Sequence, residues 1–250
     1  MNAPKLTAGL AAALCMTSLF AQADDDEFPF DEADLYFEMN HTDGDLGIHA
    51  LIDGDPWKKL TIEDPTDRKM MVIKVKGKLK QQGLTELFFE SAEPPFDELA
   101  PEDFFARFPE GEYEIEGITL EGEELESSAW LSHVMPAPAE DIYVSGVAAS
   151  DDCDDDVPEV SAPVTIEWAP VVRSHPDVGE YGVIEVTKYQ LVVEREEPEL
   201  LVYSVDLPSD VTSFSVPEAF TDLGEEFKYE ILVREASGNQ TAVESCFAME

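Results

Sequence analysis

Apolar and polar residues alternate with a period of two along most of the chain, which is typical of strands with one buried face. In residues 35–42, Leu35, Phe37 and Met39 share one face, and the residues between them are mostly polar. The same alternation predicts strands over residues 46–52, 58–64, 69–80, 85–91, 112–120 and 127–134. A single short helix is predicted over residues 100–108, where Pro101 occupies an early helical position. The first half therefore predicts an antiparallel sandwich or barrel.

The alternation resumes after a segment rich in proline and acidic residues. Strands are predicted over residues 161–171, 186–196, 200–208 and 212–217, and as a final hairpin within 223–248. A run of like charges beside prolines suits a stiff, self-repelling linker. We predict an N-terminal β-sandwich domain at residues 24–148, an acidic linker at 149–157 and a second β-sandwich domain at 158–250.

Four features of the second half occur in a recognisable order. Trp168 ends one strand, Tyr189 begins the next, a Leu207-Pro208 step follows, and Gly224-x-x-Phe227 precedes the last hairpin. This order resembles a fibronectin type III domain. The match departs from the pattern at Phe227, where a tyrosine is usual, so no corner hydrogen bond is expected there.

The Pro109-Glu-Gly-Glu-Tyr113 stretch in the first half resembles the tyrosine corner of immunoglobulin-like sandwiches. The whole chain resembles uncharacterised exported bacterial proteins with a C-terminal fibronectin type III domain. The resemblance implies an all-β fold of two tandem immunoglobulin-like or fibronectin type III-like sandwiches, with one short helix in the first. It implies no known activity.

The N-terminus has the composition of a secretory signal peptide. Lys5 precedes an apolar run, and Ala21-Gln22-Ala23 matches a cleavage site. We therefore predict a signal peptide at residues 1–23 and an exported protein, periplasmic or extracellular. Lipidation at Cys15 is the alternative, although Leu14 is larger than the residue a lipobox requires. No later segment is long and apolar enough to predict a membrane span.

The charge excludes one class of partner. The chain has 56 acidic residues against 15 lysines and arginines, for a net charge of −41. Such a surface repels phosphate backbones, so nucleic-acid binding is not expected. Solubility in a saline exterior and loose collection of divalent cations remain as explanations.

Two Asp-Gly-Asp elements are candidate calcium ligands through Asp43, Asp45, Asp53 and Asp55. A strand between them would separate the two elements by roughly 20 Å, so they cannot share one ion. Asp-Gly between alternating strands is also a strong hairpin signal. We predict two hairpin turns, and weak calcium binding with acids such as Asp24–Asp26 stays the alternative. No other cofactor is expected.

Cys153 and Cys246 are the two cysteines beyond the signal peptide, and an exported protein permits a disulfide between them. Two separate thiols are the alternative.

The basic residues concentrate in residues 58–80, where Lys74, Lys76, Lys78 and Lys80 share one face of a predicted strand. This stripe predicts either a dock for an anionic glycan or acidic partner, or an exposed sheet edge protected by lysine. Pairing with Glu112, Glu114 and Glu116 on a neighbouring strand is a third interpretation.

Catalytic motifs are scarce in this chain. Four scattered histidines and abundant acid pairs make a weak case for a hydrolase, and no nucleophile elbow or P-loop occurs. We predict a non-catalytic binding module that presents loops at the sandwich ends to a protein or glycan. A calcium-assisted adhesin or a carbohydrate-binding protein is the alternative. The candidate loops are residues 171–186, 208–212 and 235–241. The first of them, which includes residues 171–182, is the longest.

Overall fold

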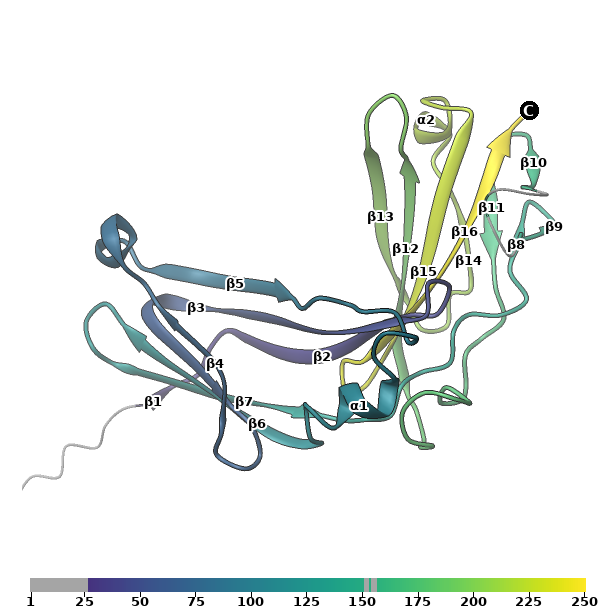
Figure 1. The fold of residues 1–250 in the computed structure, drawn as a ribbon. Helices are drawn as coiled ribbons and strands as arrows, with labels where there is room; N and C mark the ends of the chain where they lie inside the picture. Colours follow the sequence, from purple (N-terminus) through teal and green to yellow (C-terminus); the bar gives the residue numbers. More distant parts are fainter. Residues whose placement is uncertain (1–26, 151–152, 154–156) are drawn as a thin grey trace, which may run out of the picture.

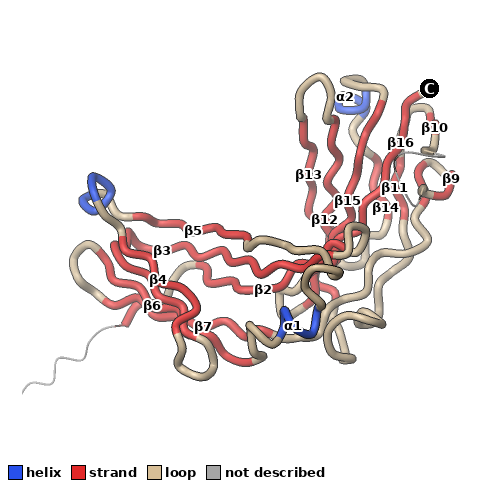
Figure 2. Tube along the Cα trace, viewed as in Figure 1, coloured by secondary structure: helices blue, strands red, loops and turns tan. Residues whose placement is uncertain are grey.

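The computed structural model describes residues 27–150, 153 and 157–250, and its regular structure is mostly β (Figures 1 and 2). Strands take up 51% of the structure and helices 6%. The strands form one twelve-stranded sheet and one four-stranded sheet. The predicted signal peptide, Asp24–Asp26 and most of the acidic linker (Asp151, Asp152 and Asp154–Asp156) lie outside the described residues. None of the described helices is long and apolar enough to cross a membrane.

The first half contains β1 (Glu27–Phe28), β2 (Glu32–Asn40), β3 (Asp45–Glu63), β4 (Lys69–Lys74), η1 (Gly77–Gln81), β5 (Leu84–Glu90), α1 (Pro101–Phe105), β6 (Gly111–Thr119) and β7 (Glu124–Leu131). The second half contains β8 (Tyr143–Val144), β9 (Val147–Ala148), β10 (Glu159–Val160), β11 (Thr165–Glu167), β12 (Val186–Arg195), β13 (Leu201–Pro208), β14 (Ser213–Ser215), α2 (Glu218–Thr221), β15 (Glu226–Glu235) and β16 (Gln240–Met249).

β3 is one strand of 19 residues, so the prediction of two strands joined by a hairpin turn at Asp53-Gly-Asp55 is wrong. Its first part pairs with β2 and β5, whereas its second part pairs with β6 and β4. The register shifts between Asp53 and Trp57. The buried positions change parity there, from Ile52 to Trp57, as a bulge requires. The Asp-Gly-Asp-Pro sequence therefore marks a bulge where the strand changes partners.

The partner change in β3 creates two layers around one core. Buried side chains from β2 and the first part of β3 pack with side chains from the second part of β3, β6 and β7 in a single cluster. Trp57, Leu60 and Ile62 are fully buried in it. Burying an aliphatic or aromatic side chain of this size contributes about 1.5–3 kcal/mol. Helix α1 adds Phe104 and Phe105 to the same core, as the predicted helix requires.

Tyr113 fixes the entry into β6. Its side chain is fully buried, and its hydroxyl donates to the carbonyl oxygen of Pro109 at 3.0 Å. The tyrosine corner that this stretch resembles includes such a return hydrogen bond, and the structure confirms it. Burial raises the pKa of Tyr113, so the hydroxyl stays protonated and remains a donor.

A second core lies between the two sheets in the second half. β12, β13, β15 and β16 contribute one layer, and β8, β9, β11 and β14 form the four-stranded sheet. Trp168 packs edge-on against Tyr189, with ring centroids 5.4 Å apart. The Tyr189 hydroxyl accepts a hydrogen bond from the Val171 backbone at 2.9 Å. The short helix α2, which the sequence does not predict, begins directly after Pro217.

The change from one core to the other comes earlier than the predicted boundary. Ala137, Ala139 and Val144 belong to the second core, and β8 pairs with β11. Residues 137–148 therefore pack with the second unit and not with the predicted N-terminal domain of residues 24–148. The prolines and acids of residues 136–141 resemble a linker in composition, but residues 135–139 are all buried.

The two units are joined through a shared sheet, where residues 240–242 of β16 pair in parallel with residues 38–40 of β2 (Figure 1). Asn239 lies at this junction and is fully buried. Its amide donates to the carbonyl oxygens of Ser132 at 2.8 Å and Val134 at 3.0 Å. Its side-chain oxygen accepts from the Phe37 backbone at 2.8 Å. One side chain thus satisfies three backbone groups from two other segments, β2 and residues 132–134.

Candidate functional site

The two Asp-Gly-Asp elements occupy different environments. Asp43 and Asp45 flank the turn between β2 and β3, where Gly44 has a φ of 68°. The first predicted hairpin turn is therefore confirmed. Asp53 and Asp55 lie within β3, well along the strand from the turn. The four carboxylates do not gather, and the prediction that one calcium ion cannot bridge the two elements agrees with this placement.

The predicted lysine stripe is not one strand. β4 ends at Lys74, and Lys78 and Lys80 lie in the 3₁₀ helix η1. Gly77, with a φ of 66°, turns the chain between them. All four lysines are exposed.

The acids proposed as partners of the lysine stripe are out of reach through strand pairing. β6, which carries Glu112, Glu114 and Glu116, pairs with β3 on the side opposite β4. Because β4 pairs only with β3 among the described strands, its other edge is free. The lysines at and beyond its end suit protection of that edge.

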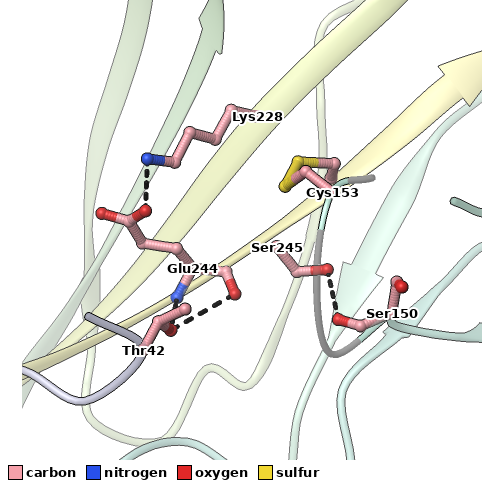
Figure 3. The surroundings of a disulfide bond; sticks show 7 residues. Thr42, Ser150, Cys153, Lys228, Glu244 and Ser245 are labelled. Carbon is pink, nitrogen blue, oxygen red and sulfur yellow. Dashed lines mark hydrogen bonds and ion pairs between the residues drawn. A yellow bond between two sulfur atoms is a disulfide. The ribbon is translucent and has the colours of Figure 1, made fainter. Parts of the chain in front are cut away.

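The structure joins Cys153 and Cys246 in a disulfide, with Cα atoms 5.5 Å apart (Figure 3). The bond ties the acidic segment to β16. Close by, the Ser245 hydroxyl donates to the Ser150 carbonyl oxygen at 2.8 Å. The segment that follows β9 is therefore attached to β16 by a covalent and a polar link.

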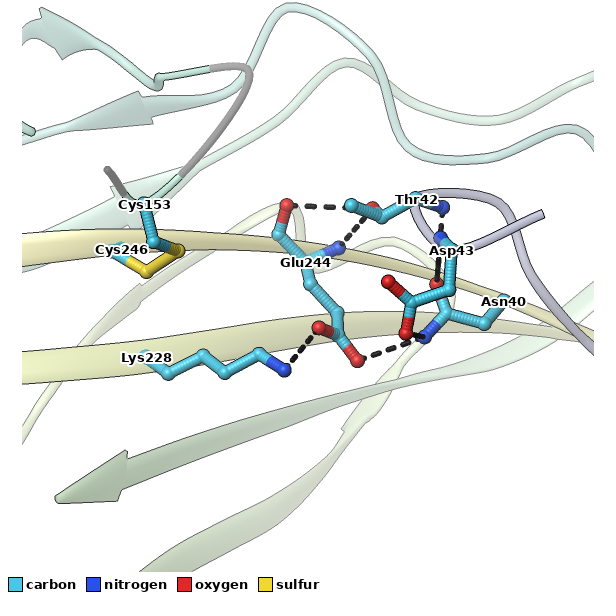
Figure 4. Close-up of polar contacts among 7 residues, drawn as sticks. All are labelled: Asn40, Thr42, Asp43, Cys153, Lys228, Glu244 and Cys246. Carbon is cyan, nitrogen blue, oxygen red and sulfur yellow. Dashed lines mark hydrogen bonds and ion pairs between the residues drawn. A yellow bond between two sulfur atoms is a disulfide. The ribbon is translucent and has the colours of Figure 1, made fainter. Parts of the chain in front are cut away.

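A network of hydrogen bonds and an ion pair connects the β2–β3 turn to β16 and β15 (Figure 4). Asn40 donates from its amide to Glu244 at 2.8 Å, and Glu244 also forms an ion pair with Lys228. Thr42 accepts a hydrogen bond from the Glu244 backbone at 2.8 Å. Together with the shared sheet, these contacts hold the two units at the junction.

The outer face of the shared sheet is crowded with carboxylates. Burial, followed by the charges of Glu38 and Glu244, raises the pKa of Glu230 to about 7. Burial, followed by the charge of Glu93, raises the pKa of Asp45 to about 6. The pKa of Glu38 is also raised, chiefly by burial. Each of these shifts means that the folded protein disfavours the charged form.

Neutralising Glu230 is expected to stabilise the protein in alkaline solution. A carboxyl with a raised folded pKa contributes stability below its ordinary pKa of 4.5, and that contribution is lost as pH rises through about 7. We expect Glu230→Gln to raise the free energy of unfolding by on the order of 2 kcal/mol at pH 8 and to have little effect at pH 4.5. Urea unfolding at both pH values measures the difference.

Glu226→Gln is the matched control, because it removes an exposed carboxylate from the same strand. It should change stability by less than about 0.5 kcal/mol at either pH. An equal effect of Glu230→Gln at both pH values would contradict the assignment.

The three candidate recognition loops differ in length and burial. Residues 235–241 are not a free loop, because Asn239, Gln240 and Thr241 are buried in the junction. The turn of residues 208–212 is short, and its tip is exposed. The loop of residues 171–182 is long and packs against both units.

Several bonds anchor the loop of residues 171–182. The His175 backbone donates to Met135 at 2.7 Å, and the Glu180 backbone donates to His133 at 2.8 Å. The buried His175 ring accepts from the Val178 backbone through Nδ1 at 2.9 Å. Its Nε2 must therefore carry the proton, and it faces Nδ1 of His41 at 3.2 Å. Burial lowers the pKa of His175, in agreement with this neutral form.

The same loop and the residues after it carry the most exposed large apolar side chains of the described chain. Val172, Tyr181 and Val183 are 81%, 94% and 99% exposed. Exposed apolar side chains that gather into one patch mark interaction sites, and these three come from one short stretch of the chain. Sequence periodicity cannot find them, because they lie outside any strand.

Two clefts lie near the junction. A cleft of about 220 Å³ between β2 and β7 is lined by Trp130, Tyr36 and Arg234, and Arg234 lies 4.7 Å from the Tyr36 ring centre. A wider cleft of about 470 Å³ is lined in part by Glu140 and Glu244.

Two of the acids that line the wider cleft form ion pairs. Glu140 pairs with Arg173 at 2.6 Å, and Glu244 pairs with Lys228. Asp141 lines the same cleft.

No family model and no curated protein matches the chain. Among solved structures, the chain is similar to one described as giving structural insight into host cell surface retention of a 1.5-MDa bacterial ice-binding adhesin. The identity is 10% and the TM-score 0.26, with 90% of this chain and 66% of that chain covered. A second is the tetra-tandem repeat in the extending region of a large adhesion protein, with 10% identity, a TM-score of 0.26, and coverage of 87% and 49%. The chain thus spans less than two thirds of each, and at these TM-scores no shared fold is established.

Proposed function

We propose that this protein is an exported, non-catalytic binding module that presents the loop of residues 171–186 to a protein partner. In this proposal its two units are immunoglobulin-like and fibronectin type III-like sandwiches, as the sequence resemblance implies. The module acts in the periplasm or outside the cell. The exposure of Tyr181 and Val183 on an otherwise anchored loop carries the proposal.

The physical support is the low entropic cost of binding through such a loop. Its backbone is held by bonds to residues 133–137, and Val178 is buried in the first core. Ordering a mobile loop would cost free energy on binding, and this loop is already ordered. An exposed tyrosine beside a valine gives an apolar anchor of the kind that dominates interface energies.

The net charge of −41 defines the partner further. A partner with a basic rim around an apolar pocket would complement both the loop and the surrounding surface.

The test is capture of a partner by the chain without its first 23 residues. We expect the purified chain to retain a protein from the native envelope fraction. The double variant Tyr181→Ser, Val183→Ser should bind that protein at least about 10-fold more weakly, a loss of about 1.4 kcal/mol. Affinities are measured with the captured protein immobilised on a biosensor.

The matched control is Leu200→Ser with Val202→Ser, which removes two exposed apolar residues near the β12–β13 hairpin. This control should bind as the unmodified chain does. Equal binding by the loop variant and the control would refute the assignment of the loop.

A second candidate function is carbohydrate binding in the cleft between β2 and β7. Trp130 is 60% exposed there and lies beside Arg234 and Asp34, which form an ion pair at 2.7 Å. An aromatic face beside charged groups suits a sugar ring. Trp130→Ser separates the two functions, because it should abolish glycan binding and leave capture of the protein unchanged. Calcium assistance, the remaining alternative, would require calcium to raise the unfolding temperature.

A further inference from the structure

A buried histidine lies among three glutamates on the outer face of the sheet formed by β2, β3 and β5. His49, on β3, is only 4% exposed. Glu90 on β5 is its direct neighbour in the strand register, and Glu93 follows just beyond the end of β5. Glu38 on β2 lies on the other side of the imidazole. No sequence motif connects these three glutamates with His49, because Glu38 comes from another strand and Glu90 and Glu93 lie more than 40 residues further along the chain.

The ligand atoms of three of these residues already lie close together. The Nε2 atom of His49 is 2.9 Å from a carboxylate oxygen of Glu93. One nitrogen of His49 and one oxygen each of Glu90 and Glu93 all lie within 4.8 Å of one another. The ligand atoms of a tetrahedral zinc ion stand about 3.4 Å apart, so modest side-chain rotation would bring the three into place.

Neighbouring residues orient the His49 imidazole and leave space for the Glu93 carboxylate. Glu38 stands 3.7 Å from Nδ1 of His49 and is itself held by the side-chain amide of Gln240. A carboxylate behind a histidine fixes the ring orientation and raises its strength as a ligand. At Gly47 a side chain is impossible without movement, because an added Cβ would lie 2.1 Å from the Glu93 carboxylate. Gly47 thus leaves the space that Glu93 occupies.

The charge of the cluster calls for a cation. Within the described part of the chain, the salt bridges of Glu38 and Glu93 are both with His49. Glu93 also faces Asp45, one of whose carboxylate oxygens is buried without a hydrogen-bond partner. One histidine cannot balance the charge of several carboxylates, whereas a bound divalent ion supplies two positive charges.

From this geometry we propose that His49, Glu90 and Glu93 bind a divalent transition-metal ion, with Glu38 orienting His49. One imidazole and two carboxylates match the ligands of zinc. Calcium prefers six to eight oxygen ligands, so an imidazole in the set favours a transition metal. The site is separate from the loop of residues 171–186 and goes beyond the proposed function.

Cobalt and zinc titrations of the tag-free chain test this proposal. We expect one tightly bound Co²⁺ per chain with visible d–d absorption, and its displacement by one equivalent of Zn²⁺. Glu90→Gln should weaken zinc binding by roughly 10- to 100-fold, and His49→Gln should abolish the cobalt spectrum. Excess Ca²⁺ at millimolar concentration should not displace the cobalt.

Glu86→Gln is the matched control, because it removes one carboxylate from the same face of β5 at a position outside the cluster. It should leave the affinity for zinc unchanged. Glu90 is exposed, so its variant reports on binding even if His49→Gln fails to fold.

Equal zinc affinity in the unmodified chain, Glu90→Gln and Glu86→Gln would overturn the site. So would displacement of cobalt by calcium, which would indicate binding by oxygen atoms alone. The Tyr181→Ser, Val183→Ser variant should retain zinc, so failure of the binding-loop proposal and failure of the metal site are distinguishable.

Discussion

Asn239→Ala is expected to lower the free energy of unfolding by about 4 kcal/mol. The substitution leaves the buried Phe37 amide, the buried carbonyl oxygen of Ser132 and the partly buried carbonyl oxygen of Val134 without this partner. Each unsatisfied buried group costs roughly 1–3 kcal/mol, and partial relaxation keeps the total below the sum. Urea unfolding followed by circular dichroism measures the loss.

We also expect Asn239→Ala to make unfolding less cooperative, because of where the residue lies. The residue lies immediately before the strand pairing of β16 with β2, so its removal should loosen the joint between the two units. We expect the variant to unfold in two separated transitions if the unmodified chain unfolds in one.

Gln190→Ala is the matched control for Asn239→Ala. Gln190 also donates from a side-chain amide, to Ser204 at 3.0 Å, but this bond is exposed on the sheet surface. Its loss should cost less than about 0.5 kcal/mol. Equal costs for the two amides would show that the buried network at the junction contributes little.

Removing the disulfide is expected to lower the free energy of unfolding by about 4 kcal/mol. Cys153 and Cys246 are 93 residues apart, and a cross-link that closes a loop of that length strongly restricts the unfolded chain. The double variant Cys153→Ser, Cys246→Ser should show this loss in urea unfolding under oxidising conditions.

Reducing agent supplies the control for the disulfide. Dithiothreitol should destabilise the unmodified chain without its first 23 residues to nearly the same extent and leave the double serine variant unchanged. Equal stability of the oxidised chain and the variant would argue that the acidic segment contributes no constraint. The expected outcome agrees with an exported protein, where disulfides persist.

The sequence predicts local features well where one residue type has one physical role. The alternation of Leu35, Phe37 and Met39 predicts β2 because a strand directs successive side chains to opposite faces. The Pro109-x-Gly-x-Tyr113 pattern indicates the hydrogen bond between these two residues, since they are close in the chain. The turn at Asp43-Gly44 follows from the positive φ that glycine adopts easily.

Sequence reasoning fails where one signal serves two structures. Asp53-Gly-Asp55 has the composition of a hairpin turn, yet it forms a bulge within β3 because neighbouring strands on both sides continue to supply partners. The lysines after Lys74 keep the alternation of a strand, but Gly77 turns the backbone into a short helix. Proline and acids at residues 136–141 resemble a linker, and only the second core shows what Ala137 and Ala139 pack against.

By itself, the sequence determined that the chain is strongly acidic, mostly β and equipped with two cysteines able to pair, because these properties depend on composition and on the period of local alternation. Tertiary structure alone decided that β2 lies beside β16, that Asn239 is buried at their junction, and that His49 meets Glu38, Glu90 and Glu93. These contacts join residues from distant parts of the chain, and pairing between strands far apart in sequence leaves no periodic trace in any one segment.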